Sequence, residues 1–127
     1  MSSAFPPSRV RVVVAEPWAH LRSVLGWVLA HDPRFEVVAL LEDGRSAAEL
    51  AAPYDLALLD LGTSGLEHGT LEQLARRAPP AAAVILAHAD VPYLRAAAAA
   101  RGAAGYLVGP DVLEELPERL AAFGLSR

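Results

Sequence analysis

Residues 54–62 read YDLALLDLG, a short apolar run that carries an aspartate at each end. A continuous run of this kind predicts a strand that is buried on both faces. An unpaired carboxylate is costly to bury beside such a strand. Asp60 therefore lies at the mouth of a site open to water, or is protonated, or is paired with another group. Which of the three holds decides what the protein does.

Similar runs and helical segments alternate on either side of this stretch. Strands are expected at 9–16, 35–41, 55–60, 81–87 and 103–108, and helices at about 18–30, 45–52, 69–78, 93–101 and from the Gly-Pro turn at 109–110 to about 124. Five such units predict a flavodoxin-like (βα)5 three-layer sandwich, with a five-stranded parallel sheet in the order 2-1-3-4-5. Pro117 falls inside the last helical segment, so that helix is expected to begin late or to bend there.

Length and composition limit the class of protein. The 127 residues fit one domain, and 54% hydrophobic with 20% charged residues is a globular composition. The net charge of −4 argues against nucleic-acid binding by this domain, and the lack of cysteine excludes disulfides and thiolate sites. The sequence shows no signal peptide and no membrane span, so a cytoplasmic domain is expected. Residues 1–8 are expected to be a disordered leader, 9–124 the domain and 125–127 a tail.

Chemistry-bearing residues follow the predicted strands. Parallel strands bring their carboxyl ends to one edge, where such folds bind their ligands. The residues expected at this edge are Glu16 and Pro17, Asp60, Ala87 and His88, and Gly109. Two carboxylates held this close either raise one pKa or recruit a cation, for which Mg²⁺ is the natural choice.

Three segments of the chain, in order, resemble response-regulator receiver domains of the CheY-like type. They are VRVVVAEPWAHLRSVLGWVL at 10–29, YDLALLDLGTSGLEHG at 54–69 and RGAAGYLVGP at 101–110. The resemblance implies that Asp60 corresponds to the aspartate that accepts a phosphoryl group from a histidine kinase. It also implies two acidic residues after the first strand for Mg²⁺, a Thr or Ser after the fourth, a Lys after the fifth, and an aromatic switch residue on the fifth.

The departures from this pattern decide the interpretation. Glu16 matches the first acidic position and Tyr106 the switch, but Pro17 replaces the second acid, Ala87 the hydroxyl and Gly109 the lysine. Each missing charge-assisted contact is worth roughly 1.5–3 kcal/mol. We therefore expect an atypical, or pseudo-, receiver: a non-enzymatic signalling module that needs no cofactor, with Mg²⁺ bound at most weakly by Glu16 and Asp60.

Two other hypotheses stay open at this point. In the first, the chain is a phospho-accepting receiver of a two-component system, in which His88 substitutes for a lost donor or responds to pH. In the second, it is a small enzyme or cofactor binder that uses the LGTSG loop at 61–65. Expected partners are a histidine kinase or another signalling protein, or a second copy bound through the surface of the alanine-rich helix, the fifth strand and the last helix, which receivers often use. Neither nucleic acid nor membrane is expected.

Overall fold

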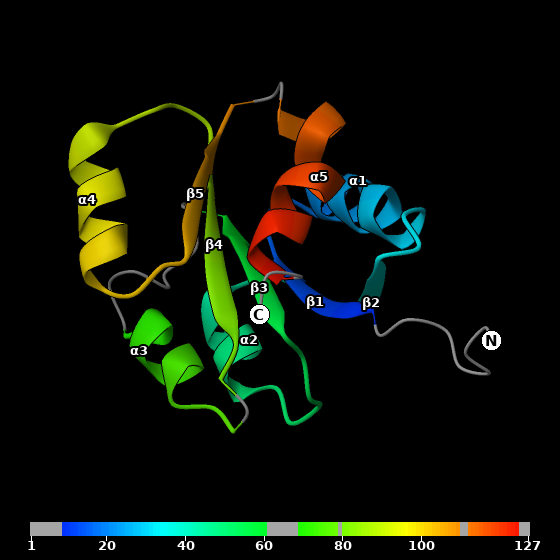
Figure 1. Cartoon of the computed structure of the whole chain (residues 1–127), viewed down its shortest axis with the longest axis horizontal. Helices are drawn as coiled ribbons and strands as arrows, with labels where there is room; N and C mark the ends of the chain where they lie inside the picture. The colour runs from blue at the N-terminus through cyan, green and yellow to red at the C-terminus, as the bar shows by residue number, and fades with distance from the viewer. Residues whose placement is uncertain (1–8, 61–68, 79, 110–111, 125–127) are drawn as a thin grey trace, which may run out of the picture.

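Strands and helices alternate along the chain in the computed structural model, which describes residues 9–60, 69–78, 80–109 and 112–124 (Figure 1). The strands are β1 (Val10–Ala15), β2 (Phe35–Leu41), β3 (Leu56–Asp60), β4 (Ala82–Ala87) and β5 (Gly105–Val108). The helices are α1 (Ala19–Ala30), α2 (Gly44–Glu49), α3 (Thr70–Ala75), α4 (Pro92–Ala100) and α5 (Val112–Gly124). The expected leader at 1–8, loop site at 61–65 and tail at 125–127 lie outside the described residues.

The five strands form one parallel sheet in the order β2-β1-β3-β4-β5. The register across its centre runs from Val14 to Leu58, from Leu58 to Val84 and from Val84 to Gly105. All five carboxyl ends therefore meet at one edge. The flavodoxin-like topology predicted from the sequence is confirmed.

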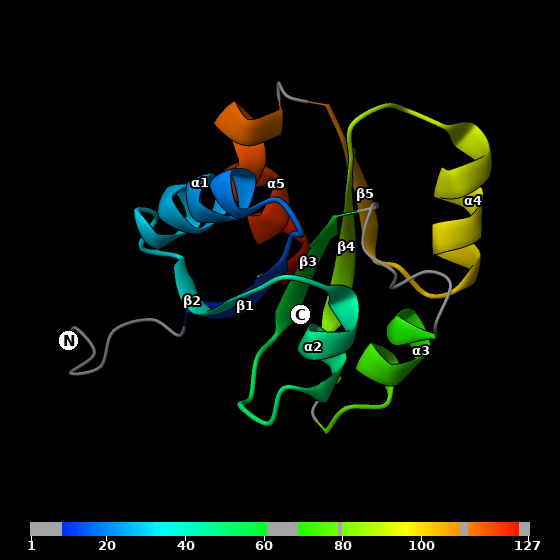
Figure 2. The same ribbon diagram turned by 180° about the vertical axis from the view of Figure 1, so that it is seen from behind.

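Helices cover both faces of the sheet, as the two opposite views show (Figures 1 and 2). Alternate residues of each central strand belong to different cores, because side chains in a strand point to opposite faces. On β3, Leu56 and Leu58 pack with the α1 and α5 side, whereas Ala57 and Leu59 pack with the α2, α3 and α4 side. This double burial explains why the strands read as continuous apolar runs.

The last helix corrects one expectation. It begins at Val112, so the late start predicted from Pro117 is wrong. An interior proline costs about 3 kcal/mol. Leu116 and Leu120, on either side of it, are both fully buried, and burying each contributes about 1.5–3 kcal/mol. This burial offsets the cost and keeps the residues before Pro117 in the helix.

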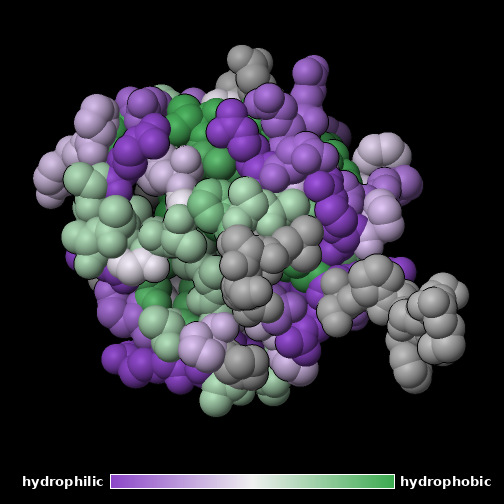
Figure 3. Space-filling model, in the orientation of Figure 1, coloured by the Kyte–Doolittle hydropathy of each residue, from purple (hydrophilic) through white to green (hydrophobic). Residues whose placement is uncertain are grey.

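Two surface properties bear on function. Weakly hydrophobic side chains gather on the α4 side of the face seen in Figure 3, where the alanine-rich helix lies. Tyr93 on that helix is 79% exposed. Among the described residues, no helix combines the length and the apolarity that crossing a membrane requires.

Candidate functional site

Three strand ends deliver the chemical groups of the site. Glu16 directly follows β1, and its N–H donates to the carbonyl of Leu41 at 2.9 Å, which continues the β1–β2 pairing by one residue. Asp60 is the last residue of β3 and lies in register with Leu86 of β4. His88 directly follows β4. The sheet therefore brings residues far apart in sequence to one edge.

These three side chains form a tight cluster. One ligand atom from each of Glu16, Asp60 and His88 lies within 4.8 Å of the other two. Asp60 Oδ2 is 3.0 Å from His88 Nε2. Glu16 and Asp60 are buried, 2% and 5% exposed, while the His88 side chain is 67% exposed. Of the three alternatives for Asp60, the structure shows a buried carboxylate paired with a histidine that lies at the surface.

The two carboxylate oxygens of Glu16 have different surroundings. Oε2 accepts a hydrogen bond from the backbone N–H of Trp18 at 2.9 Å, whereas Oε1 is buried and has no hydrogen-bond partner among the described residues. Burial raises the pKa of Glu16 to about 7, and the neighbouring Asp60 carboxyl adds to this shift. Glu16 is therefore only partly ionised at neutral pH, which agrees with the first of the two outcomes expected for carboxylates held this close.

The nearby Arg22 does not compensate this acidity. Its guanidinium donates to the backbone carbonyl of Glu16 at 2.8 Å and more weakly to that of Pro17 at 3.4 Å. Pro17 itself is exposed and offers no side-chain ligand. Arg22 fixes the turn between β1 and α1.

Ala87 and Gly109 occupy the two remaining positions that the resemblance singles out. Ala87 is buried, and its carbonyl accepts the N–H of Gly109 at 2.8 Å. Gly109 has φ of +87°, a left-handed conformation that favours glycine. A β-carbon there would meet no atom within 4 Å, so the space is open although the backbone is restrictive.

An apolar hollow of about 220 Å³ lies where these elements meet. It is lined by Trp18, Leu21, Leu86, His88, Gly109 and Leu113. Trp18, which follows the turn after β1, is one of its walls. Among the described residues, this lining includes neither lysine nor arginine. The eleven lysine and arginine residues of the sequence are all arginine, so the chain has no lysine at any position. The absence of lysine is visible in the sequence, but the expectation above concerned position 109 alone.

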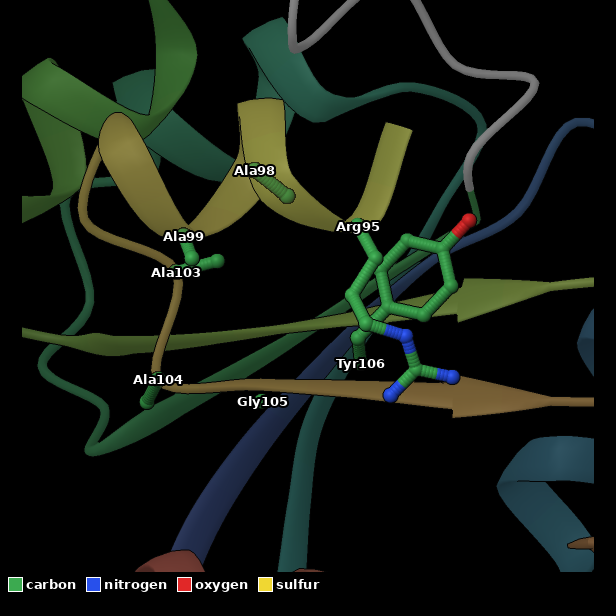
Figure 4. A pocket seen from close by; sticks show the side chains of 7 residues that line it. All are labelled: Arg95, Ala98, Ala99, Ala103, Ala104, Gly105 and Tyr106. Atoms are coloured by element: carbon green, nitrogen blue, oxygen red, sulfur yellow. The ribbon is translucent and has the colours of Figure 1, made fainter. Parts of the chain in front are cut away.

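Tyr106 lies on β5, on the side of the sheet that faces α4. The Arg95 guanidinium lies across its ring, 5.0 Å from the ring centroid (Figure 4). The Tyr106 hydroxyl is buried and has no hydrogen-bond partner within residues 9–60, 69–78, 80–109 and 112–124. A hollow of about 210 Å³ between α4 and β5 is lined by both side chains and by small residues, Ala98, Ala99, Ala103, Ala104 and Gly105. The expected switch residue thus sits between β5 and α4, with Arg95 across its ring.

The cluster fits the implied Mg²⁺ poorly. Mg²⁺ prefers oxygen ligands in octahedral geometry. Here one of the three donors is an imidazole nitrogen, one carboxyl has its pKa raised to about 7, and Pro17 supplies no third carboxylate. Glu16 and Asp60 could hold a cation, but the donor set is not one that Mg²⁺ favours.

Comparisons with known proteins agree with this fold. No family model matches the sequence. The chain is similar to the transcriptional regulatory protein DegU of Brevibacillus brevis, with 31% identity over 114 residues, which covers 85% of this chain. It spans about half, 47%, of that relative's length.

Solved structures extend the likeness. The signal receiver domain of the response regulator NarL from Mycobacterium tuberculosis superposes with a TM-score of 0.81 and 27% identity, covering 95% of this chain and all of that domain. A LuxR-family two-component response regulator from Aurantimonas superposes with a TM-score of 0.82 and 22% identity, covering 94% of this chain and 88% of that one.

Proposed function

We propose that the chain is a receiver domain of the response-regulator, CheY-like type, which its likeness to the NarL receiver domain and to DegU supports, and that it is an atypical member whose output does not depend on phosphorylation of Asp60. Such domains are typically signalling modules rather than enzymes. The module would act by binding a protein partner or a second copy of itself.

The absence of lysine is the main observation that supports this proposal. Phosphoryl transfer is catalysed by positioning and by neutralising charge. In this chain no lysine exists, and position 109, where the resemblance places one, is a glycine in left-handed backbone beside an apolar hollow. Ala87 offers no hydroxyl and Pro17 no carboxylate. A phosphoryl group on Asp60 would therefore gain almost none of its usual stabilising contacts.

The surroundings of Asp60 support the same conclusion. Its carboxylate is 5% exposed and one oxygen is in contact with His88. An incoming phosphodonor would have to displace the imidazole before it reached this oxygen. The adjoining Glu16 adds a second acidic group, which repels a phosphate dianion whenever it is ionised.

One observation favours the rival function, a phospho-accepting receiver with a rearranged pocket. His88 Nε2 lies 3.0 Å from Asp60 Oδ2, and its side chain is exposed enough to turn toward a phosphoryl oxygen. A protonated imidazole would then supply part of the charge that lysine gives elsewhere. This alternative predicts a phosphorylated product that depends on His88.

The output surface would be the side formed by α4 and β5. The motivating features are the exposed Tyr93, the exposed alanines of α4 and the Arg95–Tyr106 stack. In an ordinary receiver a hydroxyl after β4 would link this surface to the phosphorylation site. Here Ala87 cannot make that link, and the Tyr106 hydroxyl has no hydrogen-bond partner in the described part of the chain. The surface should therefore keep one binding state whatever the state of Asp60.

Incubation of the chain with acetyl phosphate and Mg²⁺ tests the proposal. Intact-mass spectrometry should show no gain of one phosphoryl group in the wild type, as in the matched Asp60→Asn variant. Sedimentation velocity on the same samples should show the same association state with and without acetyl phosphate. A stoichiometric adduct that is absent from Asp60→Asn would overturn the proposal, and its loss in His88→Ala would establish the rival.

A further inference from the structure

We propose that Glu16, Asp60 and His88 form a binding site for a divalent transition-metal ion of the Zn²⁺ type. The inference deepens the proposed function and rests on it, because it names the ligand class for a pocket no longer used for magnesium-dependent phosphorylation. The receiver fold would thus keep its acidic edge but take a different kind of ion.

The geometry of the three donors supports this assignment. Two carboxylates and one imidazole, delivered by the ends of β1, β3 and β4, have ligand atoms within 4.8 Å of one another. Around a tetrahedral ion with bonds of about 2.0–2.1 Å, neighbouring ligand atoms are about 3.3 Å apart. Asp60 Oδ2 and His88 Nε2, at 3.0 Å, already have nearly this separation. Small side-chain rotations would bring all three donors onto one ion.

The orphaned oxygen of Glu16 is an independent observation that points to a ligand. Glu16 is 2% exposed, and no group in the part of the chain that the structure describes makes a hydrogen bond with its buried Oε1. Leaving a buried acceptor unsatisfied costs about 1–3 kcal/mol, and more for a charged group. Trp18 N–H satisfies only Oε2, and Arg22 is directed to backbone carbonyls. A cation in the cluster would supply the missing partner.

The chemistry of the donors selects the class of ion. Imidazole suits Zn²⁺, Co²⁺ and other first-row transition metals, whereas Mg²⁺ prefers carboxylates and water. Three protein ligands that leave one position to water are typical of open zinc sites. The exposed side of His88 provides that open position, because its side chain is 67% exposed while both carboxylates lie beneath it.

Cobalt titration of the full chain tests the inference, because Co²⁺ bound by four or five ligands has visible absorption bands much stronger than those of the hydrated ion. The chain is first stripped of metal with a chelator and dialysed. We expect the bands to saturate at one Co²⁺ per chain, to disappear when Zn²⁺ is added, and to persist in a large excess of Mg²⁺.

Two variants and a matched control locate the site. His88→Ala and Glu16→Gln should each lower the Co²⁺ affinity at least about tenfold. His31→Ala should leave it unchanged, because His31 is an exposed histidine at the opposite end of α1 whose ring contacts the Trp27 carbonyl. Circular dichroism of each variant shows whether it is folded. If His88→Ala does not fold, His88→Gln serves in its place.

The results that would overturn the inference are distinct from those that would overturn the proposed function. Absence of the bands, their loss on adding Mg²⁺, or their retention in both His88→Ala and Glu16→Gln would reject the metal site. The phosphoryl adduct is measured separately by mass, without Zn²⁺. If both the adduct and the Co²⁺ bands were observed, only phosphorylation independence would be rejected. If neither were observed, only the metal site would be rejected.

Discussion

Carboxylates are buried at the amino ends of the parallel strands (the amino edge) and at their carboxyl ends (the carboxyl edge), but their partners differ. At the amino edge, Asp55 is 6% exposed and accepts three hydrogen bonds from Arg11: from the backbone N–H at 2.9 Å, from Nε at 3.1 Å and from Nη2 at 2.9 Å. At the carboxyl edge, Glu16 and Asp60 are as deeply buried, and Asp60 Oδ2 is 3.0 Å from Nε2 of His88, whose side chain is 67% exposed.

The difference distinguishes a structural carboxylate, Asp55, from a candidate functional one, Asp60, at the two ends of one apolar run. Asp55 and Asp60 flank the same apolar run, and both follow from the same sequence pattern. A buried carboxylate that is fully paired ties β1 to β3 and leaves nothing for a ligand. At the carboxyl edge, Asp60 is instead in contact with a histidine that lies at the surface. The contacts of Arg11 with Asp55 therefore link β1 to the start of β3, and the carboxyl edge is where we propose that binding takes place.

Breaking the amino edge should have the largest effect on stability. Asp55→Ala removes three hydrogen bonds and one partner of a largely buried ion pair, so we expect a loss of about 3 kcal/mol in the free energy of unfolding. Urea unfolding followed by tryptophan fluorescence measures it. Asp90→Ala is the control, because the Asp90–Arg95 pair is exposed and should be worth less than about 0.5 kcal/mol. Equal losses in the two variants would show that the Arg11–Asp55 pair stabilises the fold no more than an exposed ion pair does.

The same kind of change at the carboxyl edge should act in the opposite direction. The pKa of Glu16 is raised from 4.5 to about 7, so its contribution to stability is fully present below pH 4.5 and is lost as pH rises toward and through 7. Glu16→Gln does not titrate there, and its amide can donate to Asp60. We expect a gain of about 2 kcal/mol at pH 8, in metal-free buffer, that vanishes near pH 4.5.

Thermal and urea unfolding across this pH range would measure the gain. Glu49→Gln is the matched control, since Glu49 is exposed and pairs only with Arg45 on the same helix. A Glu16→Gln variant that is less stable than the wild type at pH 8 would show that the carboxylate already has a partner, and the two edges would then be alike.

The smallest effect is expected for the exposed member of the cluster. His88→Ala should change the free energy of unfolding by no more than about 0.5 kcal/mol, because the side chain is 67% exposed and its contact with Asp60 is screened by water. Denaturant titration at pH 7 measures it. A loss near that of Asp55→Ala would make His88 a structural partner of Asp60 and not a group held for binding.

The fold was predictable because continuous apolar strands and helical periodicity are local signals. The convergence of Glu16, Asp60 and His88 was also predictable, since the carboxyl ends of parallel strands share an edge. The partner of Asp55 was not, because Arg11 lies 44 residues away and no rule of spacing links the two. The hydrogen bond from the Trp18 N–H and the direction of Arg22 depend on the turn after β1, which the sequence does not specify.

The last helix illustrates a different limit. Local propensity made Pro117 a reason to shorten the helix, but the burial of Leu116 and Leu120 prevailed. Propensity describes a residue in isolation, whereas each helix here is stabilised chiefly by the face that it packs on the sheet. The pKa values and hydrogen-bond partners of the site residues depend on such tertiary contacts. This explains why the sequence predicted where these residues lie better than it predicted their charges and partners.

The backbone at Gly109 limits which residues can replace this glycine. With φ at +87°, any residue bearing a β-carbon is strained there, at a cost of roughly 1–2 kcal/mol, although the space around the β-carbon is open. A change from glycine to lysine would therefore introduce a positive charge and a folding penalty in the same step, so the charge and the main-chain conformation at this position are physically coupled.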